Sequence, residues 1–118
     1  MNVKIQFIDN IDENTIPIIK LTKSKNGKTG TATFLFIEPS LFRDVNFFTK
    51  TIDHLTLILN QKKIFTNDIE ISFKNGKPFL IKAIFIFKNS KEWFDFLSFM
   101  NQYSKETGLS FSETKSSF

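Results

Sequence analysis

Few side chains in this chain could carry out acid–base or metal chemistry. The sequence has one histidine, His54, and no cysteine, so neither a catalytic triad nor a two-histidine metal site can be built. His54 precedes Leu55 in a strand-like run, and we expect it to be structural. The carboxylates of Asp9, Asp12 and Glu13 lie close together in sequence, but no EF-hand spacing or glycine follows them. We interpret them as a solvated polar turn.

The run Gly27-Lys28-Thr29 matches the end of a phosphate-binding loop. That motif needs a glycine five positions before the second glycine, and Thr22 stands there instead. The run also falls at a predicted hairpin tip and not between a strand and a helix. The sequence therefore predicts no catalytic residue, no metal site and no cofactor, and we expect that the protein is not an enzyme.

The tetrapeptide Lys-Asn-Gly-Lys occurs twice, at 25–28 and 74–77, each time between strand-like runs. Asn-Gly favours a type I′ turn because both central positions need positive φ. Each turn would set its two flanking lysines opposite each other, which costs stability. The tips either hold positive charge out for an anionic partner or are solvated tips of a lysine-rich protein.

The first hairpin has a predictable register. The turn at 26–27 would pair Lys20 with Thr33, Thr22 with Thr31, and Ser24 with Thr29. Because side chains alternate between the two faces of a strand, the opposite face must be core. It carries Ile19, Leu21, Ala32, Phe34 and Phe36. One face of this hairpin is therefore buried, and the hydroxyl-rich face meets water or a partner.

Alternation and turn residues predict an antiparallel sheet built from hairpins. The expected strands span 3–7, 16–24, 29–37, 52–59, 63–66, 69–73 and 79–87, and the last is apolar on both faces, as in a central strand. Pro39 ends the third strand, and 40–51 is a loop or one short helix. A short strand at 109–112 is possible. We expect one domain over 1–112, with a polar and frayed tail at 113–118.

A long helix follows the strands. Ser90 is the predicted N-cap and Gly108 the residue after the last turn. Its apolar face carries Trp93, Phe96, Leu97, Met100 and Tyr103. Phe94 and Phe99 widen this face beyond an ordinary stripe, which indicates either burial on two sides, the reading we favour, or an aromatic edge for a partner. The fold class is α+β, with the long C-terminal α-helix packed on the sheet.

Composition limits the remaining possibilities. A chain of 118 residues with 41% hydrophobic residues suits one domain, and no apolar run reaches the length that crosses a bilayer. The N-terminus has neither the pattern of a signal peptide nor that of a transit peptide, so we expect the protein to act where it is made. The net charge of +4 and the pI of about 9.4 favour nucleic acid, acidic protein surfaces or anionic lipid as partners.

Two blocks of residues resemble a known family. The first runs from Ile5-Gln6-Phe7-Ile8 through Ile11-Asp12-Glu13, Ile16-Pro17 and Leu21-Thr22-Lys23-Ser24 to Gly30-Thr31-Ala32-Thr33-Phe34. The second combines Phe73-Lys74-Asn75-Gly76-Lys77-Pro78 with Glu92-Trp93, Phe96, Phe99-Met100, Tyr103 and Gly108-Leu109-Ser110-Phe111. Over residues 3 to about 112, this order and spacing resemble the photosystem II assembly factors called reaction centre protein 28.

The resemblance implies a non-catalytic photosystem II assembly or repair factor. Such a protein is peripheral on the stromal side of the plastid thylakoid membrane, or on the cytoplasmic side in a cyanobacterium. It binds immature photosystem II transiently, near the reaction-centre loops, and protects it. The tail of an inner antenna protein is expected to extend its sheet by β-augmentation. Phe, Ile, Asn and Lys make up roughly half of the residues, which suggests an AT-rich genome and, together with the lack of a transit-peptide pattern, an algal, plastid-encoded member.

The candidate partner-binding residues are those of the hydroxyl-rich hairpin face and the two lysine tips, together with Lys23 of the first hairpin. They are Lys20, Thr22, Lys23, Lys25, Lys28, Thr29, Thr31, Thr33, Lys74 and Lys77. If the strand of Thr31 and Thr33 provides the edge for β-augmentation, proline at either position abolishes capture. If capture survives, another edge is used.

The alternative is a basic module that binds single-stranded nucleic acid. Such modules stack bases on exposed aromatic side chains beside basic grooves. Here the aromatic side chains of the first hairpin share the predicted core face with Ile19 and Leu21, and no RRM-type Lys-Gly-Phe motif is present. We therefore expect no nucleic-acid partner.

Overall fold

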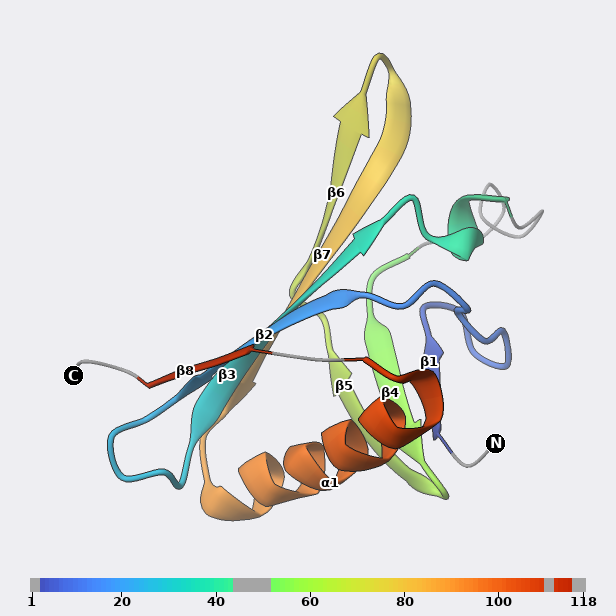
Figure 1. The fold of residues 1–118 in the computed structure, drawn as a ribbon. Coiled ribbons are helices and arrows are strands. Elements are labelled where there is room, and N and C mark those ends of the chain that lie inside the picture. Colours follow the sequence, from blue (N-terminus) through green and yellow to red (C-terminus); the bar gives the residue numbers. More distant parts are fainter. Residues whose placement is uncertain (1–2, 44–51, 110–111, 116–118) are drawn as a thin grey trace.

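The computed structural model describes residues 3–43, 52–109 and 112–115, and in this part of the chain two β-sheets pack with one α-helix (Figure 1). The elements, in chain order, are β1 (Val3–Gln6), β2 (Ile18–Lys23), β3 (Gly30–Ile37), the 3-10 helix η1 (Ser40–Arg43), β4 (Leu55–Leu59), β5 (Lys62–Thr66), β6 (Ile69–Lys74), β7 (Lys77–Phe87), α1 (Ser90–Thr107) and β8 (Ser112–Lys115).

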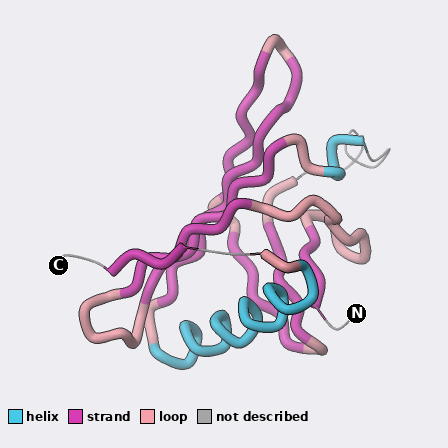
Figure 2. Tube along the Cα trace, in the orientation of Figure 1, coloured by secondary structure: helices cyan, strands magenta, loops and turns pink. Residues whose placement is uncertain are grey.

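The strands form a five-stranded sheet in the order β6-β7-β3-β2-β8 and a three-stranded sheet in the order β1-β4-β5. Every pairing is antiparallel except that of β2 with β8, which is parallel. Helix α1 contacts β1, β4 and β7, so it touches both sheets (Figure 2). The α+β prediction, with antiparallel hairpins and a C-terminal helix packed on them, is confirmed.

The first hairpin has the predicted register. Lys20 pairs with Thr33 and Thr22 with Thr31, and the Ser24 N–H donates to the Thr29 carbonyl at 3.0 Å. The predicted core face is buried throughout, with Ile19, Leu21, Ala32, Phe34 and Phe36 all at 2% exposure or less. Alternation along β2 and β3 therefore located the core correctly.

The tip of this hairpin differs from the prediction. The Gly27 N–H donates to the Ser24 carbonyl, and positive φ is found at Gly27 but not at Asn26. The side chain of Asn26 explains this, because its Oδ1 accepts hydrogen bonds from Ser24 Oγ and from the Lys28 N–H, at 2.7 and 2.9 Å. The predicted type I′ turn is wrong here, and the strand pairing ends before Lys25 and Lys28.

The second hairpin has the predicted turn. Asn75 and Gly76 have φ of 55° and 77°, and Lys74 pairs with Lys77. The register shifts between Ser72 and Phe73, close to the tip. The tip of β6 and β7 projects well beyond the other strands (Figure 1).

Helix α1 begins at Ser90, one residue earlier than predicted. Its N-cap is Asn89, and the prediction that Ser90 is the N-cap is wrong. The Asn89 side chain accepts a hydrogen bond from the Glu92 N–H at 2.9 Å. Gly108 ends the helix as predicted, with φ of 75°. The wide apolar arc is buried at Trp93, Phe96, Phe99, Met100 and Tyr103, whereas Phe94 is 53% exposed. The prediction that the wide apolar arc is buried is therefore confirmed at Phe99, whereas Phe94 lies at the surface.

Several predictions near chain breaks and strand ends need correction. Residues 113–115 do not form a frayed tail, since they lie in β8, while 116–118 lie outside the described residues. The predicted last strand at 109–112 starts only at Ser112, and 110–111 are not described. Of the range 40–51, which was predicted as a loop or one short helix, the structure describes 40–43, and these residues form the 3-10 helix η1. The rest of this range, 44–51, lies outside the described residues. His54 lies just before β4 and not in it.

Candidate docking face

The predicted hydroxyl-rich surface lies on the side of the five-stranded sheet that faces away from the core, which we call the outer face. Two rows cross this face: Lys20, Thr33 and Ile84 form one, and Thr22, Thr31 and Ile86 form the other. Lys20 and Thr22 are exposed, and Thr31 and Thr33 are partly exposed. Strands β2, β3 and β7 therefore position the predicted threonines side by side.

Sequence reasoning missed the apolar part of the outer face. Ile86 is 60% exposed, and Ile18 and Ile37 are each 48% exposed. The face is therefore mixed, with threonines near one end and branched apolar side chains beside and beyond them. The signal was present in the sequence, because the run 79–87 is apolar at both alternating sets of positions.

A shallow hollow of about 250 Å³ lies where β2, β3 and β7 meet near the β2–β3 loop. Its lining combines hydroxyl and apolar groups, from Thr22, Ser24, Thr29, Gly30, Thr31, Ile86 and Phe87. The lining contains neither an acid nor a base, so the hollow suits contact with a side chain of a partner better than chemistry.

The two lysine tips lie at opposite ends of the sheet. The loop 24–29 adjoins the Gly30–Phe87 pair, whereas Lys74 and Lys77 lie at the other end of β7 (Figure 1). β7 is 11 residues long, and a strand rises about 3.4 Å per residue, so the tips are roughly 35 Å apart. Of the predicted residues, Lys20, Thr22, Lys25, Lys28, Thr29, Thr31 and Thr33 share one region, and Lys74 and Lys77 do not. Lys23 lies at the same end of the sheet, but it follows the buried Ile19 and Leu21 in the alternation along β2 and so is not on the outer face.

Strand β3 has no free edge, because β2 pairs with one side of it and β7 with the other. The hypothesis that Thr31 and Thr33 offer an edge is therefore wrong. The remaining edge of β2 is paired with β8 over Lys20–Lys23. In the other sheet, the Glu13 N–H donates to the Ile5 carbonyl at 2.7 Å, so the connection after β1 covers part of that edge.

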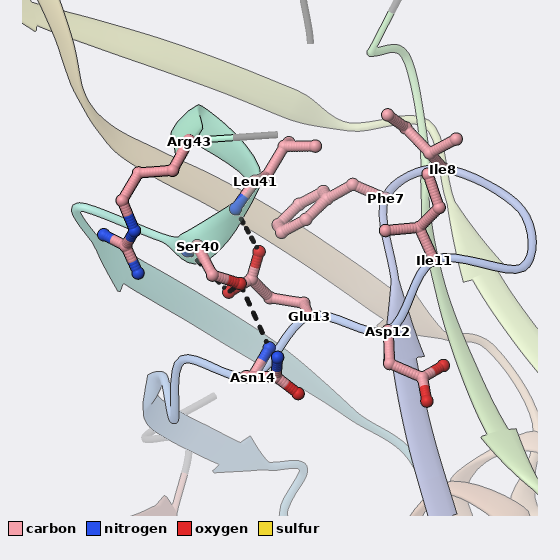
Figure 3. Close-up of a pocket in the computed structure, with 9 residues that line it drawn as sticks. All are labelled: Phe7, Ile8, Ile11, Asp12, Glu13, Asn14, Ser40, Leu41 and Arg43. Carbon is pink, nitrogen blue, oxygen red and sulfur yellow. Dashed lines mark hydrogen bonds between the residues drawn. The ribbon is translucent and has the colours of Figure 1, made fainter. Parts of the chain in front are cut away.

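The carboxylate of Glu13 connects two segments that are distant in sequence (Figure 3). It accepts hydrogen bonds from Ser40 N–H at 2.8 Å, Ser40 Oγ at 2.6 Å, Leu41 N–H at 2.9 Å and Thr15 N–H at 2.9 Å. These bonds satisfy donors at the start of η1. The prediction of a solvated turn is therefore wrong for Glu13.

A hollow of about 310 Å³ lies beside this junction and is lined by Phe7, Ile8, Ile11, Asp12, Glu13, Asn14, Ser40, Leu41 and Arg43 (Figure 3). Both carboxylates in its lining already accept hydrogen bonds within the chain. Glu13 accepts those described above, and Asp12 accepts one from Gln6 Nε2 at 2.8 Å. Burial and the nearby negative charge of Glu13 raise the pKa of Tyr103 to about 12. We interpret this region as a structural junction.

His54 joins two loops at the surface. Its Nδ1 lies 2.8 Å from Asp53 Oδ1 and its Nε2 lies 3.4 Å from Asp9 Oδ1. The hydrogen bond to Asp53 is the main cause that raises the pKa of His54, with Asp9 adding to it against the opposing effect of burial. Among the residues that the structure describes, no group of three acidic or histidine side chains could hold a metal ion.

These features define a class: a small α+β protein that presents an open sheet face and hairpin tips. No helix in the described part of the chain is long and apolar enough to cross a membrane. The family model described as "Psb28 protein" matches residues 5–111. The chain belongs to the Psb28 family.

Similar proteins support this assignment, and the similarity covers nearly the whole length of each of them. The chain is 39% identical over 107 residues to the "Photosystem II reaction center Psb28 protein" of Cyanidioschyzon merolae, covering 91% of this chain and 94% of the relative. The proteins of the same name from Guillardia theta and Trichormus variabilis are each 38% identical, covering 96% and 94% of this chain and 97% and 98% of the relatives.

Proposed function

We propose that this protein is a non-catalytic assembly or repair factor that binds immature photosystem II transiently and protects it. Membership of the Psb28 family is the observation that carries the proposal, since its relatives are named as photosystem II reaction center proteins. The protein acts as a peripheral protein on the stromal side of a plastid thylakoid membrane, or on the cytoplasmic side in a cyanobacterium. Its partners are core subunits of photosystem II and the membrane surface.

β-Augmentation by the tail of an inner antenna protein is the proposed binding mode. An added strand gains main-chain hydrogen bonds, and its alternate side chains contact the neighbouring face. In the first hairpin, β3 is paired with β2 on one side and with β7 on the other, whereas the outer side of β2 carries only the four-residue strand β8. We therefore assign the added strand to the outer side of β2. A strand beside β2 would also place its side chains next to Lys20 and Thr22 on the outer face.

Positive charge supports docking at an acidic or lipid surface. The net charge is +4, and Lys20, Lys25 and Lys28 are exposed near one end of the outer face. Charges of this kind mainly raise association rates, and they attract proteins to anionic headgroups. The reaction-centre loops and the thylakoid surface are therefore the contacts that we assign to this end.

The nucleic-acid alternative finds less support. The aromatic rings of the first hairpin, Phe34 and Phe36, are fully buried and cannot stack on bases. A filter-binding titration with single-stranded oligonucleotides distinguishes the two functions. Submicromolar affinity with a steep salt dependence would favour nucleic-acid binding.

Co-purification tests the proposed function directly. Thylakoids are solubilised with mild detergent after illumination and during repair, and photosystem II subcomplexes are separated by size. We expect the protein in fractions with incomplete photosystem II and not in those with the finished complex. Recovery in the soluble fraction alone, under all these conditions, would refute the proposal.

A further inference from the structure

The β2 edge that the proposed function requires is already occupied by the chain itself. β8 pairs in parallel with β2, with Lys20 opposite Ser112, Leu21 opposite Glu113, Thr22 opposite Thr114 and Lys23 opposite Lys115. In Figure 1, β8 lies beside β2 at the margin of the five-stranded sheet, and the paired part of β2 is Lys20–Lys23. A partner strand therefore cannot reach this edge while β8 is in place.

The pairing of β8 is weak for reasons that the sequence supplies. The strand has 4 residues, and parallel pairing is slightly less stable per residue than antiparallel pairing. Its sequence, Ser-Glu-Thr-Lys, has one residue type that favours strands, the threonine.

The other side of β2 is held firmly. Six residue pairs join β2 to β3, and Ile19 and Leu21 are buried in the core. These contacts do not involve β8. β2 therefore stays in the sheet, as an open edge strand, when β8 leaves.

From this contrast we infer that β8 is a removable strand that closes the β2 edge in the free protein, and that an extended acidic segment of the partner replaces it. This inference rests on the proposed function. Lys20, Lys25 and Lys28 are exposed near this edge, and their positive charge favours a negatively charged segment there. In the free protein, β8 protects the β2 edge from pairing with other chains.

Closure by β8 lowers the apparent affinity for the partner. When only a fraction of molecules has an open edge, the observed Kd is the intrinsic Kd divided by that fraction. Locking β8 in place should therefore abolish binding, and weakening β8 should strengthen it. A strand with no role in binding would give neither effect.

A disulfide provides the lock because the chain has no cysteine of its own. Thr22 and Thr114 are opposite each other, and neighbouring strands lie about 4.8 Å apart, within the range that a disulfide bridges. The variant Thr22→Cys/Thr114→Cys is compared in its oxidised and reduced forms. The single variant Thr22→Cys, oxidised in the same way, controls for the treatment.

Binding is measured against immobilised photosystem II subcomplexes from thylakoids that lack this protein. We expect the oxidised form of the double variant to bind at least tenfold more weakly than the reduced form of the same variant. Because both forms carry the same substitutions, any direct effect of changing Thr22 cancels in this comparison. The full-length variant Thr114→Pro, which disrupts the β8 pairing, should bind at least tenfold more tightly than the unaltered protein. Equal affinities of the oxidised and reduced forms would overturn the inference and leave the proposed function standing.

Hydrogen exchange gives a second measurement that needs no partner. Backbone amides of β2 that bond to β8 should exchange at least tenfold faster than those that bond to β3. Equal rates would mean that β8 leaves only when the whole protein unfolds, and would overturn the inference. If no form of the protein binds photosystem II, the proposed function is wrong, and the exchange rates still decide whether β8 is removable.

Discussion

The indole ring of Trp93 lies directly against the backbone of Gly30. A Cβ atom at Gly30 would be 2.7 Å from Cη2 and 2.8 Å from Cζ3 of this ring, and 2.7 Å from the Thr22 carbonyl oxygen. Gly30 is buried at the start of β3, and Trp93 is buried in the first turns of α1. This contact fixes the distance between the helix and the end of the docking face.

Gly30→Ala should therefore destabilise the fold. Overpacking of this kind costs about 1–3 kcal/mol, because both the ring and the Thr22 carbonyl belong to packed elements. Urea denaturation measures the change, and Thr31→Ala at the next, outer-face position is the control, expected within about 0.5 kcal/mol of the unaltered protein. Equal stability of the two variants would contradict the close contact.

Glu13→Gln should weaken the junction between the turn after β1 and η1. The carboxylate accepts bonds from two backbone N–H groups of 40–41, and hydrogen bonds to a charged group contribute about 1.5–3 kcal/mol each. The amide retains one acceptor oxygen, so we expect a loss of about 1–3 kcal/mol in unfolding free energy. Glu106→Gln, at an exposed position in α1, should leave stability unchanged; an equal loss there would refute a special role for Glu13.

His54 should make stability depend on pH near neutrality. Its pKa is raised in the folded state, so its contribution is fully present below the unfolded pKa of about 6.5 and is lost as pH rises through the higher folded pKa. His54→Asn should remove this part of the pH dependence. Midpoints of urea denaturation, measured between about pH 5.5 and 8.5, provide the test, and identical profiles for the two proteins would contradict the prediction.

The two lysine tips should contribute differently to association with photosystem II. Lys25→Glu/Lys28→Glu, next to the outer face, should slow association and flatten its salt dependence, with little change in the dissociation rate. Lys74→Glu/Lys77→Glu changes the net charge by the same amount at the far end of β7, and serves as the matched control. Equal slowing in both variants would indicate that net charge, and not position, determines the rate.

Local patterns predicted the parts of the fold that depend on near neighbours. Period-2 alternation gave the register of β2 with β3 and the buried face at Ile19, Leu21, Ala32, Phe34 and Phe36. Positive φ at Asn75 and Gly76 follows from the Asn-Gly pair itself. At Asn26 the same dipeptide failed, because the side-chain bonds to Ser24 and Lys28 stabilise a different turn.

Features that depend on distant residues were not predictable in the same way. The polar sequence of β8 carries no strand signal, and its partner β2 lies about 90 residues earlier, so neither could indicate the other. Glu13 looked like one more carboxylate in a polar turn until the fold placed Ser40 and Leu41 beside it. The outer face was predicted at its threonines and missed at Ile86, because the apolar residues on both faces of 79–87 were taken only as the sign of a central strand.

The length of β7 has a geometric consequence for any partner that meets both lysine tips. Such a partner must present two acidic regions at matching separation, and a partner with only one of them would be held at a single point and left free to rotate. Contact at both tips would be bivalent. The contact at the second tip would then strengthen the overall binding without any change in the residues at the first tip. The rigid ladder between the tips would thus fix the orientation in which this protein lies on its partner.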